Sequence, residues 1–191
     1  MKTKNIMIVG VGGQGTLLTS RILGALTTHA GYEVKLSEVH GMAQRGGSVV
    51  TFVRYGDKVY EPIVEEGQAD VLIAFEQLEA LRYAHFLSKN GVIIVNEQKI
   101  DPMPVVIGAA KYPDNILEQL EKTYQVYKVN ALEEAKNIGN SKVSNIIVLG
   151  VAARYMDFRK DEWMDVIEKT VPTKTTEINK IAFEIGYNYS D

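Results

Sequence analysis

Short apolar runs alternate with longer segments of helical periodicity along the whole chain, which is the pattern of an α/β fold. The run Ile6-Met7-Ile8-Val9 is apolar at consecutive positions, as a strand buried in the centre of a parallel sheet should be. After it, helical spacing places on one face Leu18, Ile22, Ala25 and His29. The two patterns predict strands at residues 5–9, 33–36, 49–55, 71–75, 92–95 and 125–129. They predict helices at residues 16–30, 77–87, 115–123, 132–138, 142–156, 161–169 and 173–186. We therefore expect a single domain with a doubly wound, mainly parallel sheet and helices on both faces, a Rossmann-like α/β fold.

Composition and charge narrow the class of ligand. The chain has 191 residues, 46% of them hydrophobic, and a net charge of −3, which suits one soluble α/β domain. The charge is uneven, because residues 1–60 hold seven Lys and Arg against three Asp and Glu, whereas residues 61–191 hold fourteen against twenty-one. The basic segment favours an anionic ligand or an acidic partner surface. It is too weakly basic for a nucleic-acid interface, which typically has a domain pI above about 9.

The residues that the chain lacks exclude several kinds of chemistry. It contains no cysteine, so a disulfide, a thiolate nucleophile or a cysteine-ligated iron–sulfur cluster within this chain is excluded. Its three histidines are scattered and have no carboxylate cluster near them, so we expect no metal ligands. We expect His29 and His85 to lie in the core or at its rim. The longest late apolar run, around residues 146–151, is far shorter than the roughly 20 residues that a membrane span needs. We therefore expect a cytoplasmic protein without membrane or nucleic-acid contacts.

A glycine-rich turn follows the first predicted strand and opens the first predicted helix. Glycines at positions 10, 12 and 15 match the spacing of a dinucleotide-binding turn, in which backbone N–H groups and a helix N-terminus face a phosphate. The candidate cofactor-binding residues are Gly10, Gly12, Gly13, Gln14, Gly15 and Thr16. The glycines could equally serve only to shape a tight turn. NAD itself is the less favoured ligand, because Glu33 comes before the end of the second strand and Glu38 falls in the loop after it, so neither suits the ribose position.

A second candidate site is the segment of residues 37–48, which we expect to be an exposed loop. It gathers a carboxylate, an imidazole, an amide and a guanidinium before the pair Gly46-Gly47, which tolerates positive φ. The candidate catalytic residues are His40, Gln44 and Arg45, contributing to a site shared with a partner. Arg45 suits a carboxylate or diphosphate, and the imidazole of His40 could relay a proton. The candidate interface residues are Glu38, His40, Gly41, Met42, Arg45, Gly46 and Gly47.

The two motifs, in this order, resemble the gamma-type subunits of 2-oxoacid:ferredoxin oxidoreductases. The first is Gly-Val-Gly-Gly-Gln-Gly at residues 10–15, and the second is Ser-Glu-Val-His-Gly-Met-Ala-Gln-Arg-Gly-Gly-Ser-Val at residues 37–49. Asp70 with the apolar residues after it, and Asn145 four residues before Leu149-Gly150, follow the same pattern. The lead-in to Arg-Gly-Gly is most similar to the small, or beta, subunits of the indolepyruvate branch. The resemblance implies a pyruvate/ketoisovalerate oxidoreductase gamma-type domain over residues 1–191.

What the resemblance implies is a division of labour between subunits. In such enzymes thiamine diphosphate and the iron–sulfur clusters belong to a larger partner subunit, which agrees with a chain without cysteine. The complex converts an aryl 2-oxoacid, coenzyme A and oxidised ferredoxin into an acyl-CoA, carbon dioxide and reduced ferredoxin. This chain would complete the site at the subunit interface and could help to hold coenzyme A. Two alternatives stay open at this point: a subunit for pyruvate, a branched-chain 2-oxoacid or 2-oxoglutarate, or a stand-alone nucleotide-binding protein such as a NAD-dependent reductase.

Overall fold

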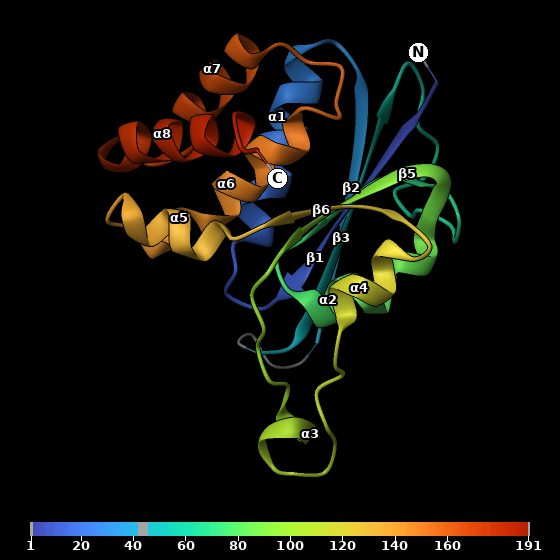
Figure 1. Cartoon of the computed structure of the whole chain (residues 1–191). Helices are drawn as coiled ribbons and strands as arrows, with labels where there is room; N and C mark the ends of the chain where they lie inside the picture. The colour runs from blue at the N-terminus through green and yellow to red at the C-terminus, as the bar shows by residue number, and fades with distance from the viewer. Residues whose placement is uncertain (1, 42–45, 191) are drawn as a thin grey trace.

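The computed structural model describes residues 2–41 and 46–190 as six strands and a set of helices around one sheet (Figure 1). The strands are β1 (Lys4–Val11), β2 (Glu33–His40), β3 (Ser48–Gly56), β4 (Ala69–Ala74), β5 (Leu87–Asn96) and β6 (Gln125–Val129). The helices are α1 (Thr16–His29), α2 (Gln77–Tyr83), α3 (Met103–Val106), α4 (Ile116–Glu121), α5 (Ala131–Asn137), α6 (Ser144–Ala153), α7 (Lys160–Thr170) and α8 (Thr176–Tyr187). Short 3-10 turns precede β5, α6 and α8 at Ala84–Phe86, Ser141–Val143 and Thr173–Thr175. No described helix is long and apolar enough to cross a membrane.

The strands form one mixed sheet in the order β2-β3-β1-β4-β5-β6. Strands β1, β4, β5 and β6 pair in parallel, as expected for a mainly parallel doubly wound sheet. Strand β3 runs antiparallel to both β1 and β2, and so opposite to all the other strands. Strands β2 and β3 are long antiparallel partners whose register extends to the pair His40 and Val49. The predicted loop at residues 37–48 was therefore too long, because its first four residues continue β2 by pairing with β3.

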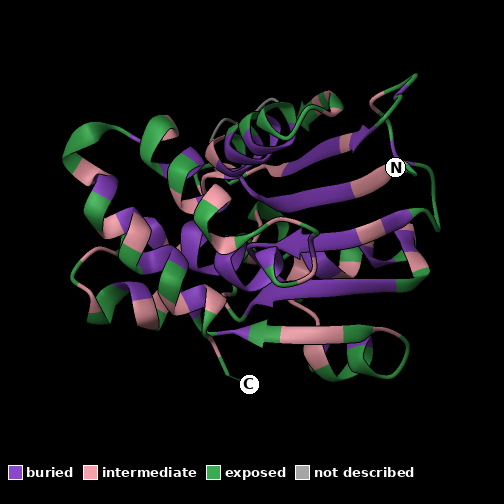
Figure 2. Cartoon of the chain, turned by 90° about the horizontal axis from the view of Figure 1, so that it is seen from above, coloured by how far each residue is buried: buried purple, intermediate pink, exposed green. Residues whose placement is uncertain are grey.

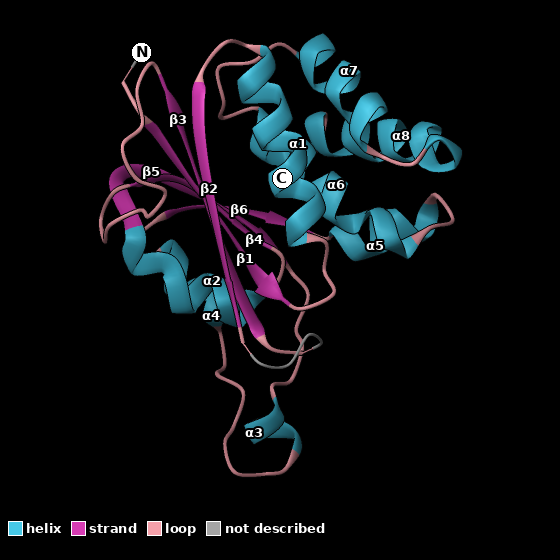
Figure 3. Cartoon of the chain, turned by 180° about the vertical axis from the view of Figure 1, so that it is seen from behind, coloured by secondary structure: helices cyan, strands magenta, loops and turns pink. Residues whose placement is uncertain are grey.

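Helices cover both faces of the sheet and enclose two separate cores (Figures 2 and 3). Side chains alternate along β1, so that Ile6 and Ile8 belong to one core whereas Met7 and Val9 belong to the other. The first core lies beneath α1, α6, α7 and α8, and contains the stacked pair Trp163 and Phe183, with ring centroids 5.7 Å apart. The second core lies beneath α2 and α4. This two-sided burial explains why β1 is apolar at consecutive positions.

Helix α1 packs closely on the sheet but not with the predicted face. Gly24 is buried, and a Cβ there would lie 3.3 Å from Leu36 of β2, so the glycine allows the helix to approach the sheet closely. The buried face of α1 runs through Ile22, Leu23 and Leu26, whereas His29 is exposed at the end of the helix. His85 is also exposed and lies 3.5 Å from Glu66. Both histidines were expected in the core or at its rim, and neither lies in the core.

Candidate functional site

Two segments that are distant in the sequence meet at the end of β1. The backbone N–H of Gly12 donates to the carbonyl oxygen of Gly47 at 2.9 Å, and the N–H of Gly46 donates to the carbonyl of Gly12 at 3.4 Å. These bonds fasten the glycine turn to the start of β3. The two motifs that sequence reasoning identified separately are therefore parts of one site.

The glycine turn leads into an uncapped helix N-terminus that faces a groove. Gly15 precedes α1 in a left-handed conformation, with φ +88°, and has no side chain that could cap the helix. The first turn of α1 contains no acidic residue. Gly12, Gly13, Gly15, Thr16 and Leu17 line one side of a groove of about 510 Å³. Exposed N–H groups and the helix dipole at such a terminus favour a bound anion.

Across the groove lie side chains of the β2–β3 hairpin. Glu38, His40 and Val49 line this side. The carboxylate of Glu38 accepts a hydrogen bond from the Thr51 hydroxyl at 3.1 Å, and His40 Nδ1 lies 3.1 Å from the carbonyl oxygen of Gly41. The sequence predicted Glu38 to lie in a loop, where it would not suit the ribose position. This prediction was wrong, because Glu38 is in β2 and shares the groove with the glycine turn.

The side chain of Gln14 holds the turn in place. Its Oε1 accepts from the Val11 N–H at 2.7 Å, and its Nε2 donates to the Phe75 carbonyl at 2.9 Å and to Gln98 Oε1 at 3.1 Å. These bonds connect the turn to the residues that follow β4 and β5. Most of the hydrogen-bonding capacity of this amide is therefore used within the protein. Gln14 was predicted as a candidate cofactor-binding residue, and its observed contacts are structural.

Three of the predicted site residues, Met42, Gln44 and Arg45, lie outside the described residues. On either side of them, Gly41 and Gly46 are both exposed, and Gly46 has φ +80°. The hydroxyl of Ser48, just beyond, donates to Glu79 of α2, whose other oxygen accepts from Arg82 at 3.2 Å. Glu79 is thus a positioning residue for this end of the site.

Asn145 also supports the glycine turn. It is 4% exposed on α6, and its Nδ2 lies 3.5 Å from the carbonyl oxygen of Gly15. A Cβ on Gly15 would lie 2.5 Å from this nitrogen, so the glycine is required here for packing as well as for its backbone conformation. The Oδ1 atom of Asn145 has no hydrogen-bond partner among the described residues. The sequence did not predict this contact, because nothing in the residues around Asn145 indicates that it reaches residue 15.

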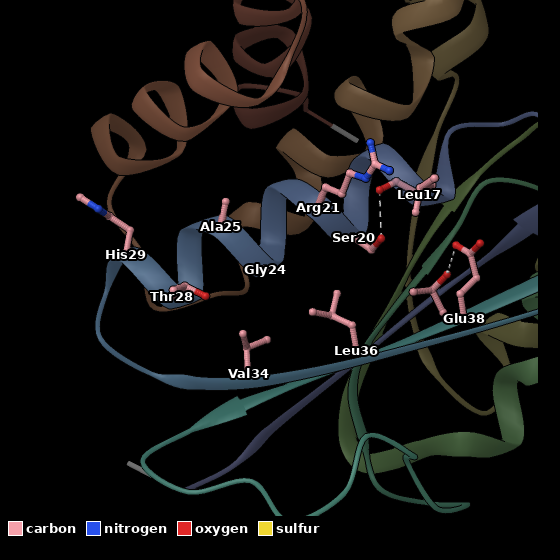
Figure 4. Close-up of a pocket in the computed structure, with 11 residues that line it drawn as sticks. Leu17, Ser20, Arg21, Gly24, Ala25, Thr28, His29, Val34, Leu36 and Glu38 are labelled. Atoms are coloured by element: carbon pink, nitrogen blue, oxygen red, sulfur yellow. Dashed lines mark hydrogen bonds between the residues drawn. The ribbon is translucent and has the colours of Figure 1, made fainter.

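A larger apolar groove adjoins the first and shares Leu17 and Glu38 with it. It measures about 710 Å³ and runs between α1 and β2, where Figure 4 shows Val34 and Leu36 rising from the strand toward the helix. Leu17 and Leu36 are 48% and 43% exposed, so this surface is apolar and open. The two grooves together combine a helix N-terminus at one end with an apolar extension.

A family model and a similar sequence agree on the protein family. Residues 5–189 match the family described as pyruvate ferredoxin/flavodoxin oxidoreductase. The sequence is 47% identical over 189 residues to the indolepyruvate oxidoreductase subunit IorB of Archaeoglobus fulgidus, covering 96% of this chain and 94% of that protein.

Solved structures show the same fold. The gamma subunit of a keto/oxoacid ferredoxin oxidoreductase from Geobacter sulfurreducens PCA has a TM-score of 0.71 at 26% identity, with 96% of both chains covered. A 2-oxoglutarate:ferredoxin oxidoreductase from Magnetococcus marinus, solved with 2-oxoglutarate, coenzyme A and succinyl-CoA bound, has a TM-score of 0.75 at 19% identity. The match covers 98% of this chain but 31% of that protein, so there the same fold is one part of a longer polypeptide.

Proposed function

Because the chain belongs to the pyruvate ferredoxin/flavodoxin oxidoreductase family, we propose that it is the small subunit of an enzyme that oxidatively decarboxylates arylpyruvates, indolepyruvate among them. The products are an acyl-CoA and carbon dioxide, and the electrons pass to ferredoxin. The 47% identity to an indolepyruvate oxidoreductase subunit, over nearly the full length of both chains, supports this substrate class. We further propose that residues 1–191 form the gamma-type domain as a whole.

The chain works only together with a larger subunit. It has no cysteine with which to ligate an iron–sulfur cluster, so the clusters, like thiamine diphosphate, belong to that partner. The observation that carries the proposal is the joining of the glycine turn to the Gly46-Gly47 backbone, since it places both motifs at one edge of an open groove. Such a surface supplies half of a site.

The chemistry of the groove suits coenzyme A. Its uncapped α1 N-terminus can hold phosphate oxygens through backbone N–H groups, with Gly13 and Thr16 beside them. Glu38 can accept hydrogen bonds from hydroxyl or amide groups of the ligand, and the adjoining apolar groove can receive its less polar part. A Cβ at Gly13 would meet no atom within 4 Å, which leaves the anion-binding end open. His40, Gln44 and Arg45 would complete the site toward the partner subunit, whose surface would cover Glu38, Gly41, Met42, Gly46 and Gly47.

The variant pair Gly13→Asp and Gly13→Asn tests this assignment. Both side chains strain the same backbone, with φ +102°, but only aspartate brings a negative charge to the α1 N-terminus. In the enzyme reconstituted with its larger subunit, Gly13→Asp should raise the KM for coenzyme A about 10-fold above that of Gly13→Asn, as expected for about 1.4 kcal/mol of repulsion. The difference should shrink as ionic strength rises. Equal KM values for the two variants would show that no phosphate binds at this turn.

A stand-alone nucleotide-binding protein is the alternative, and the position of Glu38 in β2, beside the glycine turn, is the observation that favours it. An acidic residue near the end of the second strand can bind a nucleotide ribose. Titration of NADH into the isolated chain tests this alternative. Micromolar binding of NADH with hydride transfer to a 2-oxoacid would overturn the subunit assignment. Weak binding without turnover would support the subunit assignment.

A further inference from the structure

Three of the four most exposed large apolar side chains among residues 2–41 and 46–190 belong to an arm, formed by residues 97–115, that connects β5 to α4. Figures 1 and 3 show the arm, with α3 at its tip, projecting away from the body of the protein. It starts where β5 ends, on the same side of the sheet as the glycine turn that follows the parallel strand β1. The arm therefore lies at the edge of the sheet that carries the candidate site.

The tip of the arm has the composition of a protein interior. Residues 102–110 contain no charged side chain. Met103, Val106 and Ile107 are 68%, 66% and 68% exposed, and α3 buries none of its own four residues. Charged residues of the arm occur only on its two stems, namely Glu97, Lys99, Asp101, Lys111 and Asp114. An apolar centre with charged residues around it is the usual layout of a protein–protein interface.

The base of the arm is fixed by a buried carboxylate. Glu76, which is 1% exposed, accepts hydrogen bonds from the N–H of Ile100 on one stem at 3.1 Å and from the hydroxyl of Tyr112 on the other at 2.5 Å. Gln77 adds a bond from its Nε2 to the Glu97 carbonyl at 2.7 Å and another from its backbone N–H to the Gln98 carbonyl at 3.1 Å. Both stems are thus held on α2. Such an arm presents its tip in one orientation and loses little conformational entropy when it binds.

We propose that this arm docks α3 into an apolar depression on the larger, thiamine diphosphate-binding subunit, next to the shared active site. The inference rests on the proposed function, which requires that subunit to cover the edge of the sheet from which the arm projects. The Magnetococcus marinus protein supports the choice of occupant, because there a domain of this fold continues into a polypeptide about three times as long. The absence of charge at the tip indicates that the receiving surface is apolar. Met103, Val106 and Ile107 would supply the anchoring side chains.

Charge-introducing variants of the tip test the docking. Val106→Asp with Ile107→Asp should weaken binding of the larger subunit at least 100-fold, while the thermal unfolding of the isolated chain stays unchanged, because neither residue is buried. The matched control is Ile181→Asp. Ile181 is an apolar residue of α8 that is 47% exposed, and α8 lies on the face of the sheet opposite to α2 and α4. The dissociation constant of this control should stay within 3-fold of the wild-type value. Raising the concentration of the larger subunit to saturation should restore activity in the tip variant, since the groove is untouched.

The possible outcomes separate the arm from the subunit assignment. If the tip variant binds the larger subunit as tightly as the wild type and the complex is active, the docking role is wrong and the proposed function stands. If the isolated wild-type chain is a dimer that the tip substitutions dissociate, the occupant is a second copy of this chain, which overturns the docking proposal. If the wild-type chain fails to bind the larger subunit at all, both proposals fall.

Discussion

Removing the carboxylate of Glu76 should cost much of the stability of the fold, because this one group satisfies three donors. It accepts from the Glu79 N–H at 3.0 Å at the start of α2, from the Ile100 N–H and from the Tyr112 hydroxyl. Loss of a helix N-cap costs about 0.5–2 kcal/mol, and each buried donor left without an acceptor costs about 1–3 kcal/mol. Water can reach the partly exposed stems, so we expect Glu76→Ala to lower the free energy of unfolding by about 3–5 kcal/mol.

The conservative variant should rank between alanine and the wild type. Glu76→Gln retains one acceptor oxygen but places an amide NH₂ among donors, so it should lower the free energy of unfolding by about 1–2 kcal/mol. Urea denaturation measures both values. The melting temperature of Glu76→Ala should be about 6–20 °C below that of the wild type, as expected from this loss of free energy in a chain of this size.

A surface carboxylate supplies the control for this prediction. Glu118→Ala removes an exposed glutamate from α4 and should change the unfolding free energy by no more than about 0.5 kcal/mol. Hydrogen exchange adds a local measurement, since the amide of Ile100 should exchange much faster in Glu76→Ala. A loss below about 1 kcal/mol in Glu76→Ala, with the Ile100 amide still protected, would refute the view that this carboxylate anchors the arm.

The remaining predictions concern a helix crossing, an ionisable anchor and the loop. Gly186→Ala should lower the free energy of unfolding by about 3 kcal/mol or more in urea denaturation, because a Cβ there would lie 1.9 Å from the Ile147 carbonyl oxygen where α8 crosses α6. The control Gly67→Ala meets no such contact and should cost only ~1–2 kcal/mol, from backbone strain at a φ of +73°. Burial, and after it the hydrogen bond to Glu76, raise the pKa of the Tyr112 hydroxyl. The protonated hydroxyl therefore contributes stability to the folded state below the ordinary tyrosine pKa of about 10, and this contribution is lost as the pH rises above that value. The fall in melting temperature between neutral and alkaline pH should therefore be smaller in Tyr112→Phe than in the wild type, and equal falls would contradict the linkage. Arg45→Ala should leave the melting temperature of the isolated chain unchanged and lower the activity of the reconstituted complex about 10-fold or more; full activity would remove Arg45 from the site.

The sequence predicts the fold well where local pattern and burial agree. The run from Ile6 to Val9 is apolar on both faces of β1, and it lies in the middle of the sheet between two cores. The reversed direction of β3 could not be predicted, because antiparallel and parallel neighbours give the same apolar pattern. The end of β2 was missed for another reason: Ser37, Glu38 and His40 are polar, which is typical of a loop, but residues 37–40 pair with β3.

The candidate site was predicted in its parts but not in its assembly. Glycine spacing identified the turn, and the cluster before Gly46-Gly47 identified the second segment, yet their backbone contact depends on the hairpin register. The roles of Glu76 and Glu79, and the contact of Asn145 with Gly15, could not be predicted because each side chain acts on a residue distant in the sequence. His29 was misplaced for a physical reason: it lies at the last position of α1, where the helix extends past the core.

One titration tests most directly whether this chain completes an arylpyruvate-oxidising complex. The purified chain is added in increasing amounts to the larger thiamine diphosphate subunit, and coenzyme A-dependent ferredoxin reduction is followed with indolepyruvate, phenylpyruvate, pyruvate, a branched-chain 2-oxoacid and 2-oxoglutarate. We predict that activity rises to saturation as the complex forms, with kcat/KM for the arylpyruvates at least about 10-fold above the others, a discrimination of about 1.4 kcal/mol. Full activity of the larger subunit alone, or a preference for pyruvate or 2-oxoglutarate, would contradict the proposed function.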